Sequence, residues 1–253
     1  MSDRRSMHGP WRTALVVGAS SGIGAAVARQ LAEHGCRVAL VARREAELAR
    51  LAAALGGDGS VRAYAHDVTR AAEVPALFQQ ICRDLGGLDL LVYAAGVMPQ
   101  VAGEEYTFAK DREIVEVNLL GAIAWINEAA PRFDRARAGT IVGISSVAGD
   151  RGRRGNPAYA SSKAGLDAYL EAIRNRIGRH GVAVVTVKPG PVDTPMTEHI
   201  DRKPFLISAE EAARQTLAAA ARRARIAYVP RKWRPIMLVV RHIPSPLFQR
   251  LDL

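Results

Sequence analysis

Short apolar segments typical of β-strands alternate with amphipathic helical segments along most of this 253-residue chain. Strict alternation of this kind favours right-handed βαβ units and a parallel sheet with helices on both faces. We therefore predict an α/β fold, a doubly wound parallel sheet in one domain spanning residues 1–253, with residues 231–253 as a basic and apolar C-terminal extension. The expected strands cover about 13–17, 37–42, 61–66, 88–95, 140–145, 182–187 and 226–229, and the expected helices cover about 22–34, 45–55, 72–85, 108–133, 158–180 and, as the last, 209–223.

The composition is that of an ordinary globular protein, with 49% hydrophobic and 24% charged residues. No apolar stretch is long enough to span a bilayer, and the polar start lacks the apolar centre of a signal peptide, so a cytoplasmic location is expected. The two cysteines, Cys36 and Cys82, have neither CxxC nor metal-ligand spacing, which predicts reduced thiols and no metal site. The net charge of +10 favours anionic partners, but without a recognised nucleic-acid motif no nucleic-acid partner is expected.

The first expected strand runs into a glycine-rich turn, Gly18-Ala-Ser-Ser-Gly22-Ile-Gly24, ahead of an expected helix. Glycines let a backbone turn tightly and approach a pyrophosphate, and the helix that follows offers free N–H groups and the positive end of its dipole. The spacing is GxxxGxG and differs from the more common GxGxxG. It predicts a dinucleotide site, with a purely structural turn as the alternative.

The end of the second strand indicates which dinucleotide is bound. An acidic residue about 20 positions after the glycines would accept the ribose hydroxyls of NAD. Here Ala42 occupies that place and is followed by Arg43 and Arg44. Because arginine can pair with a 2′-phosphate, NADP(H) is favoured. NAD(H) is the alternative, with Glu45 and Glu47 as the acids that would serve it.

Tyr159 and Lys163 are four residues apart in an expected helix, which places a phenol and an ammonium group on one face, one turn apart. A cation beside a phenol favours the phenolate and lowers the pKa of the tyrosine. A tyrosine with a lowered pKa suits proton-transfer catalysis. The spacing alone is weak evidence and depends on the motifs around it.

Further motifs follow the expected strands. Tyr93-Ala-Ala-Gly follows the fourth, Ser146 lies thirteen residues before Tyr159, and Pro189-Gly190 follows the sixth. With the glycine turn and the Tyr–Lys pair, these motifs resemble the classical short-chain dehydrogenase/reductase (SDR) family over residues 14–197. The resemblance implies a single-domain Rossmann fold of about seven strands and an NADP-preferring oxidoreductase that reduces a ketone or aldehyde, or oxidises the alcohol. Tyr93 replaces the asparagine of the family motif, which puts the bracing of the central sheet in doubt.

The resemblance also implies a role for four residues. Tyr159 would be the general acid in the reductive direction, and Lys163 would lower its pKa and hold the nicotinamide ribose. Ser146 would hydrogen-bond the substrate oxygen, and Asn118 would hold a water that links Lys163 to solvent.

The family pattern assigns further residues to the cofactor and to a mainly apolar substrate pocket. The residues expected at the cofactor are Gly18, Ser20, Ser21, Gly22, Ile23, Gly24, Arg43, Arg44, Asp67, Val68, Ala94, Ala95, Gly96, Asn118, Tyr159, Lys163, Pro189, Gly190, Val192 and Thr194. Those expected at the substrate are Val97, Met98, Pro99, Ser146, Val147, Ala148, Asp150, Pro191 and Met196.

Three other segments bear on the substrate and the partners. The segment after Thr194 is expected to form a mobile lid. The basic run Arg151-Gly-Arg153-Arg154 is either a solvated loop or a site that attracts an anionic substrate or lipid headgroup. The basic and apolar residues 231–253 can contact an anionic membrane, cap the substrate pocket or pack in an oligomer interface.

Several alternatives stay open at this level. By analogy with the family, the helices at 108–133 and 158–180 predict a homodimer or homotetramer. One alternative function is reduction of a membrane-linked keto-sugar or lipid. Another is a non-catalytic NADP-binding regulator, which would not need Ser146, Tyr159 and Lys163 together.

Overall fold

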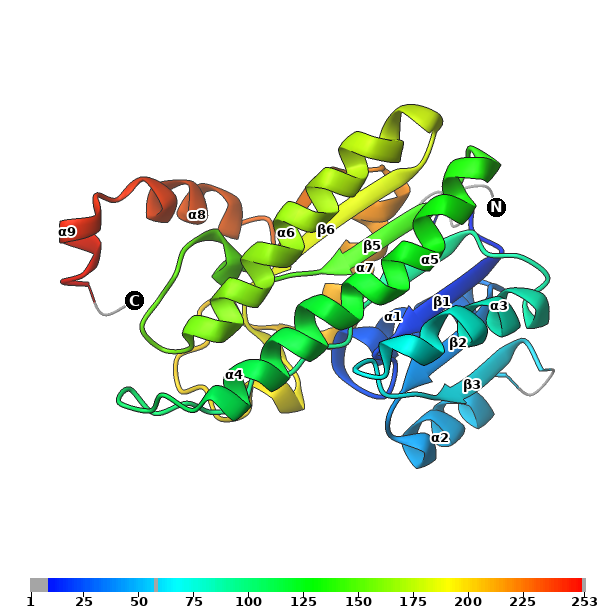
Figure 1. Ribbon diagram of the computed structural model, residues 1–253, viewed down its shortest axis with the longest axis horizontal. Coiled ribbons are helices and arrows are strands. Elements are labelled where there is room, and N and C mark those ends of the chain that lie inside the picture. Colours follow the sequence, from blue (N-terminus) through cyan, green and yellow to red (C-terminus); the bar gives the residue numbers. More distant parts are fainter. Residues whose placement is uncertain (1–8, 57–58, 252–253) are drawn as a thin grey trace.

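A parallel sheet forms the centre of the computed structural model, which describes residues 9–56 and 59–251 (Figure 1). Within these residues the sheet has seven strands in the order β3-β2-β1-β4-β5-β6-β9. The order changes direction between β1 and β4, which is the switch point typical of doubly wound sheets. The predicted Rossmann fold is confirmed. The strands are β1 (Thr13–Val17), β2 (Arg37–Ala42), β3 (Val61–Ala65), β4 (Leu90–Tyr93), β5 (Thr140–Ile144), β6 (Ala183–Pro189) and β9 (Ile226–Val229).

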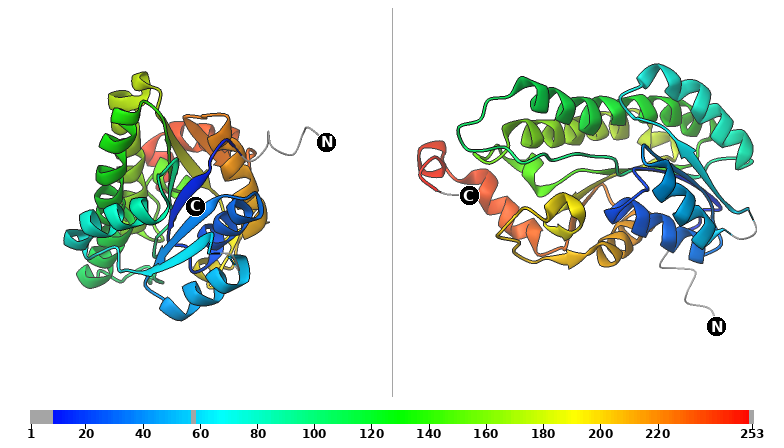
Figure 2. Two further views of the ribbon diagram at one scale, coloured as in Figure 1. Left: turned by 90° about the vertical axis from the view of Figure 1, so that its right-hand side faces the viewer. Right: turned by 90° about the horizontal axis from the view of Figure 1, so that it is seen from below.

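Helices cover both faces of the sheet, with α3, α5 and α6 on one and α1, α2 and α7 on the other (Figures 1 and 2). Strand β1 explains why the central strands are apolar throughout, since Leu15 and Val17 face one helical layer while Ala14 and Val16 face the other. The helices are α1 (Gly22–Glu33), α2 (Glu45–Leu55), α3 (Val74–Asp84), α4 (Phe108–Val115), α5 (Gly121–Ala136), α6 (Pro157–Ile177), α7 (Ala209–Ala221), α8 (Trp233–His242) and α9 (Ser245–Phe248).

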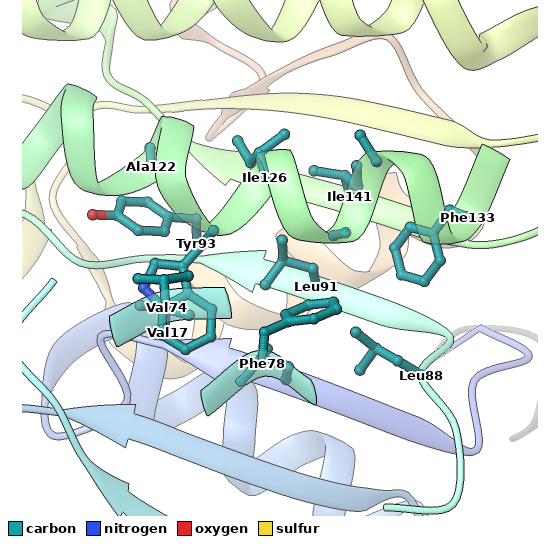
Figure 3. Packing of buried hydrophobic residues seen from close by; sticks show 14 of the residues in the cluster. Val17, Val74, Phe78, Leu88, Leu91, Tyr93, Ala122, Ile126, Phe133 and Ile141 are labelled. Carbon is teal, nitrogen blue, oxygen red and sulfur yellow. The ribbon is translucent and has the colours of Figure 1, made fainter. Parts of the chain in front are cut away.

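The larger apolar cluster lies between β4 and the helices α3 and α5 (Figure 3). Phe78 of α3, Leu91 of β4 and Phe133 of α5 are buried in it. Tyr93 ends β4 at the edge of this cluster, where the loop toward the functional site begins. The core therefore fixes the strand end from which that loop leaves.

Three boundaries differ from the sequence predictions. Strand β4 is shorter than the predicted 88–95 and covers Leu90–Tyr93, with one further ladder bond from the N–H of Ala94 to the carbonyl of Val17. The long helix predicted at 108–133 contains one wider π turn at Glu116–Leu120, between α4 and α5. The prediction that the helix at 209–223 is the last is wrong, since α8 and α9 follow it.

Residues 1–8, most of the polar start, lie outside the described residues. In the described ranges, no helix has the length and apolar character needed to cross a bilayer. Cys36 and Cys82 are both buried and free, as predicted.

Candidate active site

A cavity of about 820 Å³ opens at the carboxyl ends of the central strands. In a parallel sheet these ends share one edge, so loops far apart in sequence meet there. Among the predicted residues, Asp67, Asn118 and Asp150 do not line the cavity. Those that do are Gly18, Ser20, Ser21, Gly22, Ile23, Gly24, Arg43, Arg44, Val68, Ala94, Ala95, Gly96, Val97, Met98, Pro99, Ser146, Val147, Ala148, Tyr159, Lys163, Pro189, Gly190, Pro191, Val192, Thr194 and Met196.

The glycine turn after β1 is packed so tightly at Gly18 and Gly24 that neither position has room for a side chain. Gly18 has a φ of 90°, and a Cβ there would collide with the backbone of Ala94 and Ala95. A Cβ on Gly24 would collide with the carbonyl group of Gly18. Helix α1 starts at this turn without an acidic residue in its first turn, so its positive dipole end is not neutralised locally. The turn therefore fits the pyrophosphate of a dinucleotide.

The two arginines after β2 lie beside this turn. Arg44 donates hydrogen bonds to the Oγ of Ser20 at 2.8 Å and to the Oγ of Ser21 at 2.6 Å. Arg43 is 4.0 Å from the carboxylate of Asp67. Asp67 also accepts two hydrogen bonds from Thr69. Although partial burial acts to raise the pKa of Asp67, these bonds and Arg43 hold it below its ordinary value, so the residue stays an anion outside the cavity.

Ser146, Tyr159 and Lys163 meet at the cavity because a loop after β5 and the start of α6 lie side by side. The Oγ of Ser146 accepts a hydrogen bond from the N–H of Ala148 at 3.1 Å. The side chain of Asn156 caps α6 by accepting the N–H of Tyr159 at 2.9 Å, which fixes the first helical turn. One turn later, Lys163 donates from Nζ to the carbonyl oxygen of Ile144 at 2.9 Å.

Burial dominates the ionisation of this group. The Nζ of Lys163 lies 5.7 Å from the ring centre of Tyr159. Burial lowers the pKa of Lys163 to about 8, while Asp167 acts in the opposite direction. Burial raises the pKa of Tyr159, and its hydrogen bond with Ser146 opposes the change. The expectation of a lowered tyrosine pKa is therefore wrong for this structure, because loss of water around the phenolate outweighs the hydrogen bond with Ser146.

Asn118 lies in the π turn and is fully buried beneath the loop that follows β4. Its Oδ1 accepts the N–H of Val97 at 2.7 Å, and its Nδ2 donates to the carbonyl of Val97 at 3.0 Å and to the Oγ of Ser162 at 3.2 Å. Asn118 therefore joins the loop after β4 to α6. Its predicted role in holding a water stays a prediction.

The side chain of Tyr93 supports the same π turn through a hydrogen bond. The phenol is buried and donates a hydrogen bond to the carbonyl oxygen of Val117 at 2.6 Å, next to Asn118 in the chain. A Cβ on Gly121 would lie 2.5 Å from this hydroxyl, so the turn closes over the phenol only because that position is glycine. The departure from the family motif thus supplies a brace of its own, which no local pattern in the sequence indicates.

We expect Tyr93→Phe to lower the free energy of unfolding by about 1–3 kcal/mol, because it leaves a buried carbonyl without its donor. Thermal or urea unfolding measures the loss. Tyr169→Phe is the matched control, since that phenol binds Asn127 in an exposed position and its loss should cost little. Equal losses in the two variants would contradict the brace.

A buried ion cluster lies next to the site and was not expected from the sequence. Lys188 of β6 contacts the carboxylates of Asp150 at 2.5 Å and Asp167 at 2.8 Å. The hydroxyl of Tyr228 donates to Asp150 at 2.8 Å. The prediction that Asp150 lines the substrate pocket is therefore wrong, because its charge is buried against a lysine 38 positions away.

The cavity has further walls that sequence reasoning missed. Trp233 of α8 lines it and packs so closely on Gly190 that no side chain fits there. His199 and Arg202 also line the cavity, and both belong to the segment predicted to be a lid. This segment lies between β7 (Val192–Asp193) and β8 (Ile207–Ser208), which pair in parallel. The contact of Trp233 with Gly190 supports one of the three alternatives for the C-terminal segment, that it caps the pocket.

Comparison with known proteins agrees with this geometry. A family model described as short chain dehydrogenase matches residues 12–204. A protein from Myxococcus xanthus (strain DK1622), named an uncharacterized oxidoreductase, is 35% identical over 204 residues, which are 80% of this chain and 81% of that protein.

Solved structures are similar as well. A protein described as a short chain dehydrogenase/reductase family protein aligns with a TM-score of 0.78 and 28% identity, covering 88% of this chain and 96% of that one. A variant of actinorhodin polyketide ketoreductase, solved with NADPH, aligns with a TM-score of 0.77 and 26% identity over 87% of this chain and 95% of that one. Fold, site and relatives agree: the chain belongs to the short-chain dehydrogenase/reductase family of oxidoreductases.

Proposed function

We propose that this protein uses NADPH to reduce a ketone or an aldehyde, or catalyses the reverse oxidation of the alcohol. The observation that carries the proposal is that Ser146, Tyr159 and Lys163 line the same cavity as the glycine turn. A hydroxyl, a phenol and an ammonium group thus face the space into which a dinucleotide bound at that turn would extend. The solved relative with NADPH is a ketoreductase, which supports the same reaction class.

The chain's own residues would control charge and protons during the reaction. The bound cofactor supplies the hydride. As negative charge develops on the carbonyl oxygen, the hydroxyls of Ser146 and Tyr159 stabilise it, and Tyr159 transfers its proton to it. A raised pKa keeps Tyr159 protonated at neutral pH, which is the form that reduction needs. Lys163, cationic below about pH 8, stabilises the phenolate that remains.

The same proposal assigns the cofactor contacts. Residues 18–24 would hold the pyrophosphate, Lys163 the nicotinamide ribose, and the segment from Pro189 to Thr194 the carboxamide. Arg43 and Arg44 would bind the 2′-phosphate of NADPH beside the glycine turn. No carboxylate lines the cavity among the described residues, although that of Asp67 lies outside it, 4.0 Å from Arg43.

Replacing Arg44 tests the cofactor preference. We expect Arg44→Ala to raise the Kd for NADPH by roughly 10- to 100-fold, as loss of charge-assisted hydrogen bonds does, and to change the Kd for NADH little. Fluorescence titration of both dinucleotides measures the change. Arg50→Ala is the control, because Arg50 is an exposed arginine of α2 paired with Glu47. Equal weakening of NADPH and NADH would assign Arg44 to the shape of the turn and not to phosphate binding.

A screen for NADPH oxidation over ketones, aldehydes, quinones and keto-sugars tests the reaction class. Turnover of at least one carbonyl class is the expected result. Tight binding of NADPH without oxidation by any of these compounds would instead favour the non-catalytic regulator.

The surface of α8 favours a second proposal, contact with an anionic membrane. Leu238 and Val239 are 62% and 65% exposed, and Arg234 and Arg241 lie on the same short helix. Such a surface suits a bilayer of anionic lipids and a membrane-linked keto-sugar or lipid as substrate. We expect wild type to sediment with phosphatidylglycerol vesicles and the variant Leu238→Glu/Val239→Glu to stay in solution. Equal sedimentation of the two proteins would end this proposal.

Assembly into a homodimer or homotetramer through the long helices is proposed by analogy with the family. Phe108 and Leu120 are exposed along the first of these helices, which supports the idea.

A further inference from the structure

The three arginines between Ser146 and Tyr159 have different surroundings. Arg151 donates to the carbonyl of Val240 at 2.9 Å, and its guanidinium group lies 4.0 Å over the ring centre of Phe248. Arg154 donates to the carbonyl of Gln249. These two residues therefore attach the loop to α8 and α9, which lie beside it at one end of the molecule (Figure 1). Their charges serve the fold of the C-terminal segment.

Arg153 lies between them and faces the cavity. Its Nε is buried and has no hydrogen-bond partner, and its Nη2 contacts only a weak acceptor, the Sδ of Met237, at 3.6 Å. Among the residues that the structure describes, no carboxylate pairs with Arg153 within 4.0 Å. The nearby carboxylate of Asp150 is already bound by Lys188. Arg153 is only partly buried, but its buried Nε–H has no acceptor, which is costly unless a ligand supplies one.

Arg153 lines the same cavity as Ser146, Tyr159 and Lys163. Met237, which it contacts, packs with Trp233 and Val147 in one buried cluster. Val147 directly follows Ser146 in the chain. Arg153 is therefore attached to the wall beside Ser146, whereas Arg44 is attached to the serines of the glycine turn.

The charges around the cavity favour an anionic ligand. The described residues that line it include the cations Lys163, Arg153 and Arg202 but neither aspartate nor glutamate. Near Ser146 the wall is otherwise largely apolar, with Val147, Ala148 and Trp233. A planar guanidinium group on an apolar wall matches the geometry of a carboxylate through two parallel hydrogen bonds.

We propose that Arg153 binds the carboxylate of a keto acid whose carbonyl group is held by Ser146 and Tyr159. This inference rests on the proposed function and specifies its substrate class. The free Nε–H and an Nη–H of Arg153 would donate to the two carboxylate oxygens. Its neighbours would keep their structural contacts, so one residue of the basic loop selects the substrate and the other two hold the C-terminal segment.

The test compares keto acids of several chain lengths with their neutral methyl esters, using steady-state kinetics with NADPH. Wild type should prefer the acid of the best-fitting length. Arg153→Met should lower kcat/KM for that acid by roughly 10- to 100-fold, the effect of losing a charge-assisted pair, and leave the ester unchanged. Arg154→Met, which removes the neighbouring charge outside the cavity, should leave the acid-to-ester ratio unchanged.

The outcomes separate this inference from the proposed function. If wild type reduces neutral carbonyl compounds but shows no preference for acids, the inference fails and the proposed function stands. If Arg153→Met loses activity equally on acid and ester, Arg153 has a structural role and the inference also fails. If wild type oxidises NADPH with no carbonyl compound, the proposed function fails and the inference with it.

Discussion

Tyr159→Phe is expected to lower kcat for carbonyl reduction by roughly 10²- to 10⁴-fold, the range typical for loss of a general acid. The variant keeps the ring and removes the hydroxyl that bears the proton. The Kd for NADPH should change by no more than about threefold, because the ring that borders the cavity stays in place. Steady-state kinetics and a fluorescence titration measure the two quantities separately.

The control for this variant is Tyr106→Phe, because the side chain of Tyr106 is 92% exposed and does not line the cavity. Its kinetics should equal those of wild type. Retained turnover in Tyr159→Phe would reject Tyr159 as the proton donor, whatever the fate of cofactor binding.

The second large effect is expected from Lys163→Met, which should lower kcat/KM by roughly 10²- to 10⁴-fold. The buried Lys163 ammonium donates to the carbonyl of Ile144 and lies 5.7 Å from the ring centre of Tyr159, where in the proposed mechanism it stabilises the phenolate. Methionine has a similar length but neither charge nor donor. Steady-state kinetics measures the loss, and a loss of only a few fold would contradict the electrostatic role of Lys163.

The pH dependence follows from the same residue. The pKa of Lys163 is lowered from its ordinary value to about 8, so the side chain is cationic below that pH and loses its charge as the pH rises through it. In wild type, kcat/KM for reduction should fall above about pH 8, since this parameter reports the free enzyme. Lys163→Arg, if folded, should lack this limb because its guanidinium group stays charged. An unchanged limb in that variant would assign the ionisation to another group.

Most of the fold could be predicted because its signals are local. The apolar strands and the glycine turn are visible within short windows, and their alternation with helices predicts a parallel sheet covered on both faces. Strand β1 illustrates this, since all five of its residues are buried and its run of apolar residues alone predicts a buried strand. The Tyr–Lys spacing and Ser146 were likewise readable from the chain, and the structure brings them to one cavity.

What the sequence could not indicate depends on contacts between distant residues. The arginines at 151, 153 and 154 look alike as a run of basic residues, but their roles depend on carbonyl groups and a thioether about 84–95 positions away. The sequence position of Asp150 predicted a pocket residue, but its side chain instead binds Lys188 and Tyr228, which are distant in the chain. The replacement of the family asparagine by Tyr93 predicted a loss of bracing. The hydrogen bond of Tyr93 to the carbonyl of Val117 could not be predicted, because a backbone acceptor has no sequence signature.

Transfer of deuterium from NADPH labelled at both C4 positions tests the central claim most directly. The labelled cofactor is incubated with the protein and a carbonyl compound found in the screen, and the alcohol is analysed by mass spectrometry and NMR. We predict one deuterium on the carbinol carbon with wild type and none above background with Tyr159→Phe over the same time. Oxidation of NADPH that leaves no deuterium in the alcohol would contradict hydride transfer at this site.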